Sequence, residues 1–266
     1  MSMKRALLSA ATRGKVDELR QLVARSDAEV LGSLLTPQFD TAVHIAALHG
    51  HSRFVREALS LNRELLFSRN RDGDTPLHLA ARAGKERVAR LLAGLAQGWT
   101  FDASSRDDGF QVPPYTNTRY SLSLCVFCSF KPQDRGDTPL HVAVRHRREP
   151  VALTLIEASP YSALQLNDSM ESPLHLAARE GLSYVVWKIL RIATVEQRPS
   201  ISDRGTPLHE AARGGHFLIL TLLVEKRPEL TELVDASGSN ALHYAAERNE
   251  KRMVKILSCT GASSSL

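Results

Sequence analysis

A short segment that occurs six times sets the spacing of most of this 266-residue sequence. Its fullest copy reads Thr75-Pro76-Leu77-His78, followed by Leu-Ala-Ala-Arg. The other copies begin at Thr41, Thr138, Ser172, Thr206 and Asn240. Four of the five steps between successive copies are 34 residues long, and the step from 75 to 138 is 63 residues, one period plus 29. A fixed period of this size indicates a stacked array of small repeats.

Each repeat is expected to be a pair of short antiparallel helices. Thr suits the N-cap of a helix, and Pro suits the first helical position, where no backbone N–H is needed. In four copies a glycine follows nine residues after the Thr position, as expected for a left-handed residue that ends a helix. Positions 13, 14 and 17 after the Thr are apolar in every copy, which is helical spacing. Such a unit cannot bury its apolar faces alone, so neighbouring repeats must stack.

The pattern Thr-Pro-Leu-His-x-Ala-Ala resembles the signature of ankyrin repeat proteins. The resemblance implies an all-α solenoid of about seven helix-turn-helix repeats with short hairpin fingers and one long irregular insert. It also implies that the motif histidine hydrogen-bonds the threonine hydroxyl and nearby backbone, which is a structural role. The residues assigned to this structural motif are Thr75, Pro76, Leu77, His78, Thr138, Pro139, His141, Pro173, His175, Thr206, Pro207, His209 and His243.

The repeat period divides the chain into three parts. Residues 1–97 are expected to hold repeats one to three, the first a divergent cap, and residues 134–266 are expected to hold repeats four to seven. The intervening residues 98–133 show no helical periodicity and contain two adjacent prolines, so we expect a long, disordered loop. Removing 29 residues here restores the 34-residue period, and the Ser-Leu-Cys-Val-Phe run can be encoded almost entirely by pyrimidines. We therefore hypothesise that this insert is translated intron, with a genuine functional loop as the alternative.

Composition argues against several locations and classes of protein. A net charge of +5 spread over 63 charged side chains is mild and does not by itself indicate a nucleic-acid-binding protein. Three cysteines do not form a disulfide framework, which favours a reducing compartment. No segment has the apolar length of a signal peptide or a membrane span. We expect a monomer located in the cytoplasm, with the nucleus as an alternative.

A narrower resemblance suggests a second interpretation of the whole chain. The long connections 155–167 and 223–234, together with the 34-residue period, are similar to those of plant ankyrin proteins that usually carry a multi-span membrane domain after the array. No such domain is present in this sequence. The chain would then be a truncated or soluble member of a membrane-linked defence or signalling family, with membrane association through a longer form.

No pattern in the sequence predicts catalysis. One pattern could be mistaken for a zinc site: Cys125-x2-Cys128-x12-His141-x4-His146 has zinc-finger spacing. We reject it because His141 is a motif histidine and Pro132 occupies the place of the usual finger aromatic. A metal or enzymatic role built on the insert is therefore the least favoured alternative. No phosphate loop, carboxylate pair or nucleophile elbow occurs, so we expect no enzyme, cofactor or metal.

Nucleic acid is also disfavoured as a partner. The basic cluster at residues 145–148 falls where the two helices of repeat four should turn, which is typical of a solvated loop. No aromatic residues interleave with these charges, as they would in a nucleic-acid surface.

Surface recognition of another protein is the function that remains. The residue seven positions after the Thr is arginine in repeats three to six, and the residue before the Thr is acidic in repeats two to five. Stacking would align these residues into a basic row beside an acidic row on the concave face. A partner protein with alternating charge, or an acidic segment, could then bind these rows. We favour the simpler alternative that the rows neutralise each other across neighbouring repeats. The candidate partner-binding residues are Arg71, Asp72, Asp74, Arg82, Asp134, Arg135, Asp137, Arg145, Glu171, Arg179, Glu180 and Arg213.

The intron hypothesis makes a direct prediction about the transcript. We expect the dominant mature message to lack the codons for about 29 residues between 98 and 133, because their removal restores the period of the stack. Sequencing the transcript across this region measures this. A dominant message that encodes the whole insert would contradict the hypothesis and make the insert a candidate functional loop.

Overall fold

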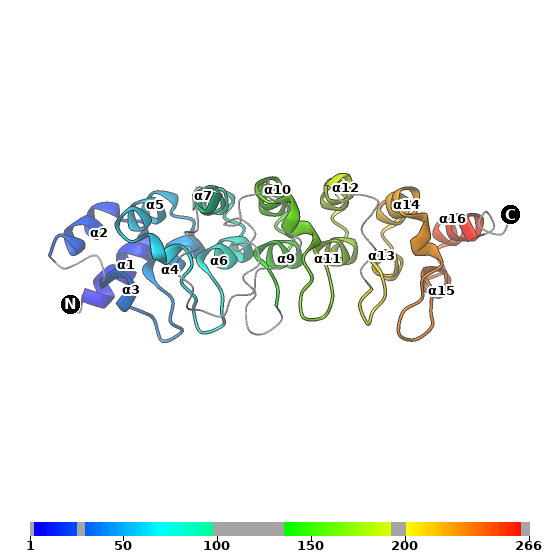
Figure 1. The fold of residues 1–266 in the computed structure, drawn as a ribbon, viewed down its shortest axis with the longest axis horizontal. Helices are drawn as coiled ribbons and strands as arrows, with labels where there is room; N and C mark the ends of the chain where they lie inside the picture. Colours follow the sequence, from blue (N-terminus) through cyan, green and yellow to red (C-terminus); the bar gives the residue numbers. More distant parts are fainter. Residues whose placement is uncertain (1–2, 26–29, 98–135, 193–200, 262–266) are drawn as a thin grey trace, which may run out of the picture. The chain divides into compact units, whose positions relative to one another are not determined.

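The computed structural model describes residues 3–25, 30–97, 136–192 and 201–261. The chain divides into two compact units, Met1–Asp134 and Arg135–Leu266. Within the described residues, regular structure is helical apart from one isolated bridge between Ser202 and Gly205 (Figure 1). The predicted all-α repeat architecture is therefore confirmed. The insert predicted at residues 98–133 lies outside the described residues.

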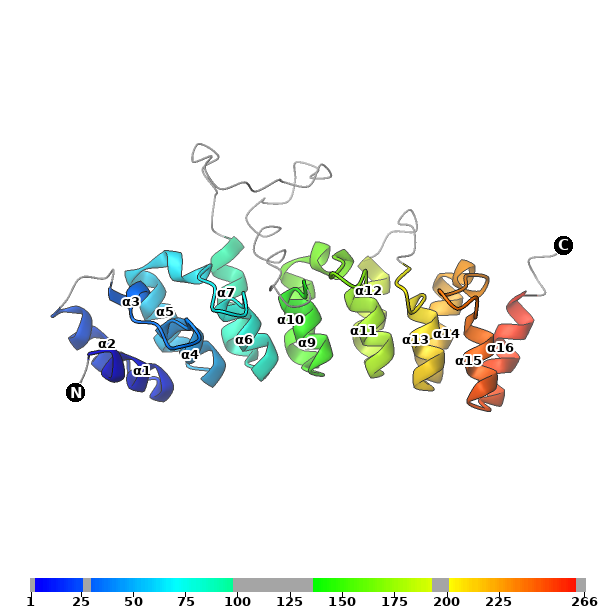
Figure 2. The ribbon, with the colours of Figure 1, turned by 90° about the horizontal axis from the view of Figure 1, so that it is seen from below.

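The first unit consists of helix pairs arranged in two layers. The first helices α1, α4 and α6 pack in sequence against one another (Figure 2), and the second helices α2, α5 and α7 form the other layer (Figure 1). A short 3₁₀ helix, η1, follows α5, and α3 lies in the connection after the first pair. Their bounds are α1 Met3–Arg13, α2 Val16–Val23, α3 Val30–Ser33, α4 Ala42–His49, α5 Ser52–Leu61, η1 Arg63–Leu66, α6 Pro76–Ala83 and α7 Glu86–Gln97.

The second unit repeats this arrangement with four helix pairs. The first helices α9, α11, α13 and α15 pack in sequence, and so do the second helices α10, α12, α14 and α16. The long connections after α10 and α14 each contain a 3₁₀ helix. The bounds are α9 Pro139–Arg145, α10 Glu149–Ala158, η2 Pro160–Leu164, α11 Pro173–Glu180, α12 Ser183–Ile192, α13 Pro207–Gly214, α14 Phe217–Lys226, η3 Pro228–Thr231, α15 Ala241–Glu247 and α16 Lys251–Gly261.

The core lies between the two helix layers of each unit. The apolar positions 13 and 17 residues after each Thr are buried in all six repeats that carry the motif, as their helical spacing predicts. The small motif alanines, such as Ala80 and Ala81, are also fully buried, which lets neighbouring helices approach closely. In the 3₁₀ connections, Leu66 and Leu230 turn inward and extend this core.

Within each unit, motif histidines join a repeat to the next one. In repeat two, the backbone N–H of Thr41 donates to His44 Nδ1 over 3.2 Å. Nδ1 must therefore be the unprotonated nitrogen, so Nε2 carries the proton and donates to the carbonyl of Asp74 in the next repeat, 3.0 Å away. His141 and His209 make the same bond to the carbonyls of Glu171 and Ser239.

His175 is the exception among these histidines. Its ring is fully buried, its Nδ1 accepts from the Ser172 backbone, and its Nε2 has no hydrogen-bond partner in the described part of the chain. The carbonyl expected to accept a hydrogen bond from His175 Nε2 belongs to Gly205. That oxygen instead accepts from both the backbone N–H and the hydroxyl of Ser202, because the finger of repeat six closes on itself. The junction between repeats five and six therefore lacks the well-formed hydrogen bond that His44, His141 and His209 make, although the Gly205 carbonyl still opposes the effect of burial on the pKa of His175.

Acid should destabilise the protein through His175. Burial lowers the pKa of His175 to about 4, whereas an unfolded chain titrates near 6.5. The unfolded state then binds a proton that the folded state excludes, so the stability contribution is present above pH 6.5 and is lost as the pH falls toward 4. We expect the free energy of unfolding to fall by about 2 kcal/mol from this group between pH 7 and pH 5.

Urea unfolding followed by circular dichroism at the two pH values measures this loss. The matched control is His175→Gln, which cannot take up the proton and should show a shallower dependence on pH. Equal pH dependence in the two proteins would contradict the assignment.

Candidate functional site

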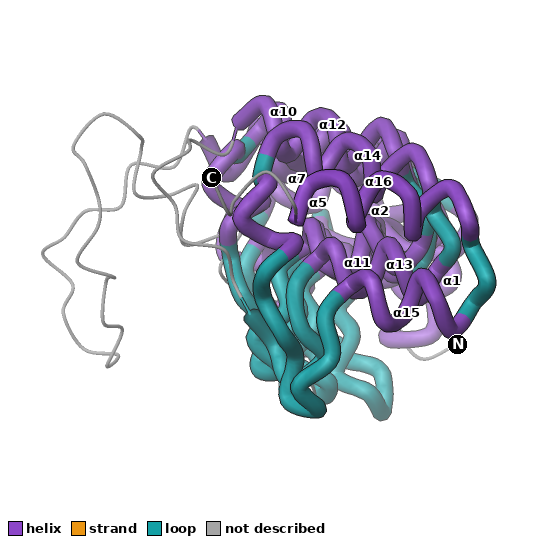
Figure 3. Tube along the Cα trace, turned by 90° about the vertical axis from the view of Figure 1, so that its right-hand side faces the viewer, coloured by secondary structure: helices purple, strands orange, loops and turns teal. Residues whose placement is uncertain are grey.

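The finger loops project from the first-helix side of each unit (Figure 3). One asparagine organises each of two fingers. Asn70 Oδ1 accepts the backbone N–H groups of Asp72 and Asp74 at 3.1 and 2.9 Å, and its Nδ2 donates to Asp40 of the preceding finger. The Arg71 N–H also donates to the Gln38 carbonyl at 2.8 Å, which ties the two fingers together. The finger therefore has a fixed backbone conformation.

The second unit uses the same device. Asn167 Oδ1 accepts from the backbone of Ser169 and Glu171, and its Nδ2 donates to Asp137 of the preceding finger at 2.8 Å. In repeat seven Asp235 takes the accepting part of this role. Asn70 and Asn167 were missed by the sequence analysis, although both stand five positions before the repeat Thr or Ser. Aligning the copies at that position would have found them.

The predicted charge rows form ion pairs with each other. Arg82 contacts Asp74 at 2.6 Å, Arg145 contacts Asp137 at 2.9 Å, and Arg179 contacts Glu171. Each of these pairs lies within one repeat, whereas neutralisation across neighbouring repeats was expected. The reason is geometric: the acid precedes the helix and the arginine lies two turns along it, and helical side chains lean back toward the N-terminus.

Repeats five to seven add contacts that do cross between repeats. Glu210, only 1% exposed, bonds to Arg179 of the preceding repeat at 2.7 Å and to Arg204 and Arg213 of its own. Arg213 also contacts Asp235 of the next repeat at 2.7 Å. The result is a continuous charge ladder of Glu171, Arg179, Glu210, Arg213 and Asp235. Sequence reasoning missed Glu210, because only this copy has an acid at the fourth position after the Thr.

Two buried acids respond differently to their neighbours. Burial alone would raise the pKa of Glu210, but hydrogen bonds from Arg179 and Arg204 outweigh it and lower the pKa to about 2. For Asp74, burial is the larger effect and raises the pKa even though Arg82 opposes it. Glu210 is thus a fixed negative charge at the centre of the ladder, held by three arginines.

The candidate residues from the sequence occupy three kinds of place. Arg71 and Asp72 are exposed at the tip of the finger of repeat three. The acids Asp74, Asp137 and Glu171 are buried. The arginines Arg145, Arg179 and Arg213 keep between 21% and 26% of their side chains exposed, and Glu180 is half-buried at the end of α11. Asp134 and Arg135 lie outside the described residues.

Two apolar finger residues were also missed by the sequence analysis. Phe39 and Met170 are 52% and 53% exposed, with φ angles of 62° and 57°. Both stand two positions before the repeat Thr or Ser, where repeats three, four and seven have glycine. A non-glycine residue in this left-handed region costs on the order of 1 kcal/mol. The sequence signal was available: a large apolar residue at a glycine position.

The zinc pattern lies partly outside the described residues, and the membrane alternative depends on a longer form of the chain. The pair Cys125 and Cys128 lies outside them, and the ring of His141 is hydrogen-bonded to Thr138 within its own motif. Across the described ranges, no cluster of three or more His, Cys, Asp or Glu side chains could hold a metal ion. Within the same ranges, no helix combines the length and the apolar character that crossing a membrane requires.

Removing the charge of Glu210 should destabilise the second unit. Glu210→Gln leaves the arginines around it with a weaker acceptor, and breaking a buried ion pair in this way costs about 3 kcal/mol. Urea unfolding measures the change. The control is Glu157→Gln, which removes the exposed pair with Lys188 and should cost under about 1 kcal/mol. Equal effects of the two variants would show that the ladder contributes no more than an exposed pair.

Comparisons with known proteins agree with this architecture. The family model described as three copies of the ankyrin repeat matches residues 6–103 and 174–265, and the model of a single ankyrin repeat matches residues 135–163. No curated protein sequence matched the chain.

Two solved structures show the same fold at low identity. The ankyrin repeat domain of human ASB11 is 20% identical over 94% of this chain and 96% of its own, with a TM-score of 0.61. The ankyrin repeat domain of Bcl-3, described as a unique member of the IkappaB protein family, is 19% identical over 95% and 97%, with a TM-score of 0.69. Ankyrin repeat domains generally mediate protein–protein interaction and are typically non-catalytic. Because the family models match well over half of its residues, this chain belongs to the ankyrin repeat family.

Proposed function

We propose that this protein is a non-catalytic scaffold that binds a partner protein with its finger loops. The observation that carries the proposal is Phe39, a large apolar side chain held half-exposed in a left-handed backbone conformation. Glycine would remove the backbone strain, and a polar residue would suit the solvent. Residues kept in strained conformations cluster at binding sites, where the strain is part of the function.

The surroundings of Phe39 support a binding role. The neighbouring finger places the exposed charges of Arg71 and Asp72 beside it, joined through the backbone bond from Arg71 to Gln38. On the first helix of the same repeat, Leu48 is also exposed. An apolar anchor surrounded by polar side chains is typical of an interface core and its rim.

The fingers are already ordered before any partner binds. The cross-finger bonds made by Asn70, and by Asn167 in the second unit, fix the loop backbones. Association therefore loses little conformational entropy, which favours affinity for a given contact area. Met170 gives the second unit an exposed apolar side chain at the same position of its finger.

The arginine row has a secondary part in this proposal. Arg82, Arg145, Arg179 and Arg213 remain partly exposed, and each also holds a buried acid. An acidic partner would compete with those intramolecular pairs, so the finger tips contribute more of the specificity. A cytoplasmic location, a monomeric state and membership of the plant defence and signalling group stay predictions from the sequence.

Changing the finger tip should remove partner binding without unfolding the protein. We expect Phe39→Gly combined with Arg71→Glu and Asp72→Lys to lose the proteins that the wild-type full chain retains in affinity capture with quantitative mass spectrometry. The control is Arg53→Glu, an exposed change on α5, which should retain them. An unchanged set of captured proteins with the triple variant would exclude the finger tips as the interface.

The backbone strain at Phe39 should be measurable in the free energy of unfolding. Phe39→Gly should raise the free energy of unfolding by on the order of 0.5 kcal/mol, because relief of the left-handed strain exceeds the added entropy of an unfolded glycine. Phe39→Ala removes the same ring and keeps the strain, so it should not stabilise the protein. Urea unfolding of both variants measures the difference, and equal stabilities would argue against strain.

A further inference from the structure

The second-helix layer of the first unit contains a pocket of about 420 Å³ that the finger-loop proposal does not use. It lies between α5, η1 and α7, and its described lining is Arg56, Leu59, Ser60, Arg63, Leu66 and Leu95. A pocket of this volume is within the range of ligand sites. No carboxylate occurs among these lining residues.

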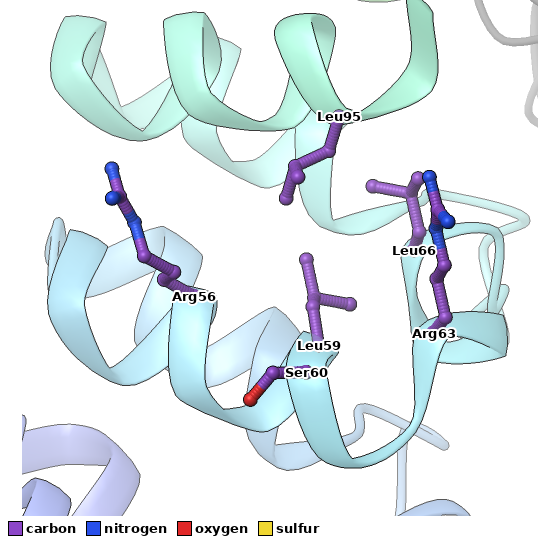
Figure 4. Close-up of a pocket in the computed structure, with 6 residues that line it drawn as sticks. All are labelled: Arg56, Leu59, Ser60, Arg63, Leu66 and Leu95. Atoms are coloured by element: carbon purple, nitrogen blue, oxygen red, sulfur yellow. The ribbon is translucent and has the colours of Figure 1, made fainter. Parts of the chain in front are cut away.

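The lining separates apolar and positive groups. Leu59 and Leu66 are buried at the floor, and Leu95 reaches toward them from α7 (Figure 4). Arg56 and Arg63 stand on opposite sides of these leucines (Figure 4), and both side chains are exposed. Arg56 forms no ion pair with the residues that the structure describes.

The spacing of charge distinguishes between possible occupants. Two positive groups on either side of an apolar floor are matched by a ligand that is acidic at both ends and apolar between them. An amphiphile with a single anionic head would pair with only one arginine. Arginine binds carboxylates through parallel charge-assisted hydrogen bonds, and it is among the residues that contribute most to protein interfaces.

We propose that this pocket is a second interaction site, which binds a peptide segment of a partner protein with acidic side chains flanking one or two apolar residues. The apolar side chain contacts Leu59, Leu66 and Leu95, and the acids pair with Arg56 and Arg63. The site lies on α5, η1 and α7, and the finger loops contribute nothing to it. A protein of this design holds one partner at its fingers and a second segment at this pocket.

The test selects peptides against the intact 266-residue chain. A phage-displayed library of random 12-residue peptides is selected on the wild type and depleted on the variant Arg56→Glu/Arg63→Glu. We expect enrichment of sequences in which acidic residues flank Leu, Ile, Val, Met or Phe. By fluorescence anisotropy, an enriched peptide should bind the double variant at least ten times more weakly than the wild type.

Matched controls separate the pocket from general surface charge. Arg53→Glu changes the same charge one turn earlier on α5, outside this pocket, and should leave the affinity within twofold of the wild type. Arg56→Gln/Arg63→Gln removes the charges without reversing them and should also weaken binding. Circular dichroism confirms that each variant is folded, and sodium laurate is titrated in parallel as a single-headed amphiphile.

Several results would overturn the proposal. They are the absence of an enriched acidic-apolar-acidic pattern, equal binding to the wild type and the Arg56/Arg63 variants, or an equal loss with Arg53→Glu. Binding of laurate that depends on Arg56 and Arg63, without peptide binding, would assign the pocket to an amphiphile instead.

Discussion

The hydrogen bond from a motif histidine to the backbone of the next repeat is the interaction on which each stack depends. Helices of seven or eight residues, such as α9 and α11, are too short to be stable alone. The threonine and histidine of the motif cap the helix start, and the same imidazole then reaches across to the next finger. One residue thus couples local helix formation to the stacking of repeats. At His175 the corresponding carbonyl, that of Gly205, accepts from Ser202, and the ring nitrogen Nε2 has no hydrogen bond of normal geometry within the described residues.

Electrostatics adds a second link between repeats, and this link changes how the surface should be understood. Burying Asp137 or Glu210 beside a helix requires a positive partner, and the arginine seven positions after the Thr, or its neighbours, supplies one. A row of arginines whose charge would match an acidic ligand is therefore largely occupied by the protein's own acids. We therefore assign the proposed recognition to side chains that hold no buried acid, among them Phe39 at a finger tip and Arg56 on the second-helix layer.

These two places suit a scaffold with separate contacts. The finger around Phe39 is rigid because its backbone is tied to the neighbouring finger, so it presents a preformed surface. The pocket around Leu59 presents an apolar floor between two arginines, on another set of elements of the same unit. A stack of short repeats provides both, because the core constrains only the inward-facing positions and leaves tips and outer helix faces free to vary.

The sequence by itself determined the repeat unit, the helix starts and the buried positions, because the capping threonines and the helical spacing of residues such as Val88 and Leu92 depend on local chemistry. It also predicted which residues would line up, such as Asp74 and Arg82. Only the tertiary structure decided that they pair within a repeat, that Glu210 joins three arginines, and that Phe39 has a left-handed backbone at an exposed tip. It alone brought Arg56, Arg63 and Leu95 around one pocket. The physical reason is that these properties depend on distances between side chains on different elements, and a linear pattern fixes their order but not their separation.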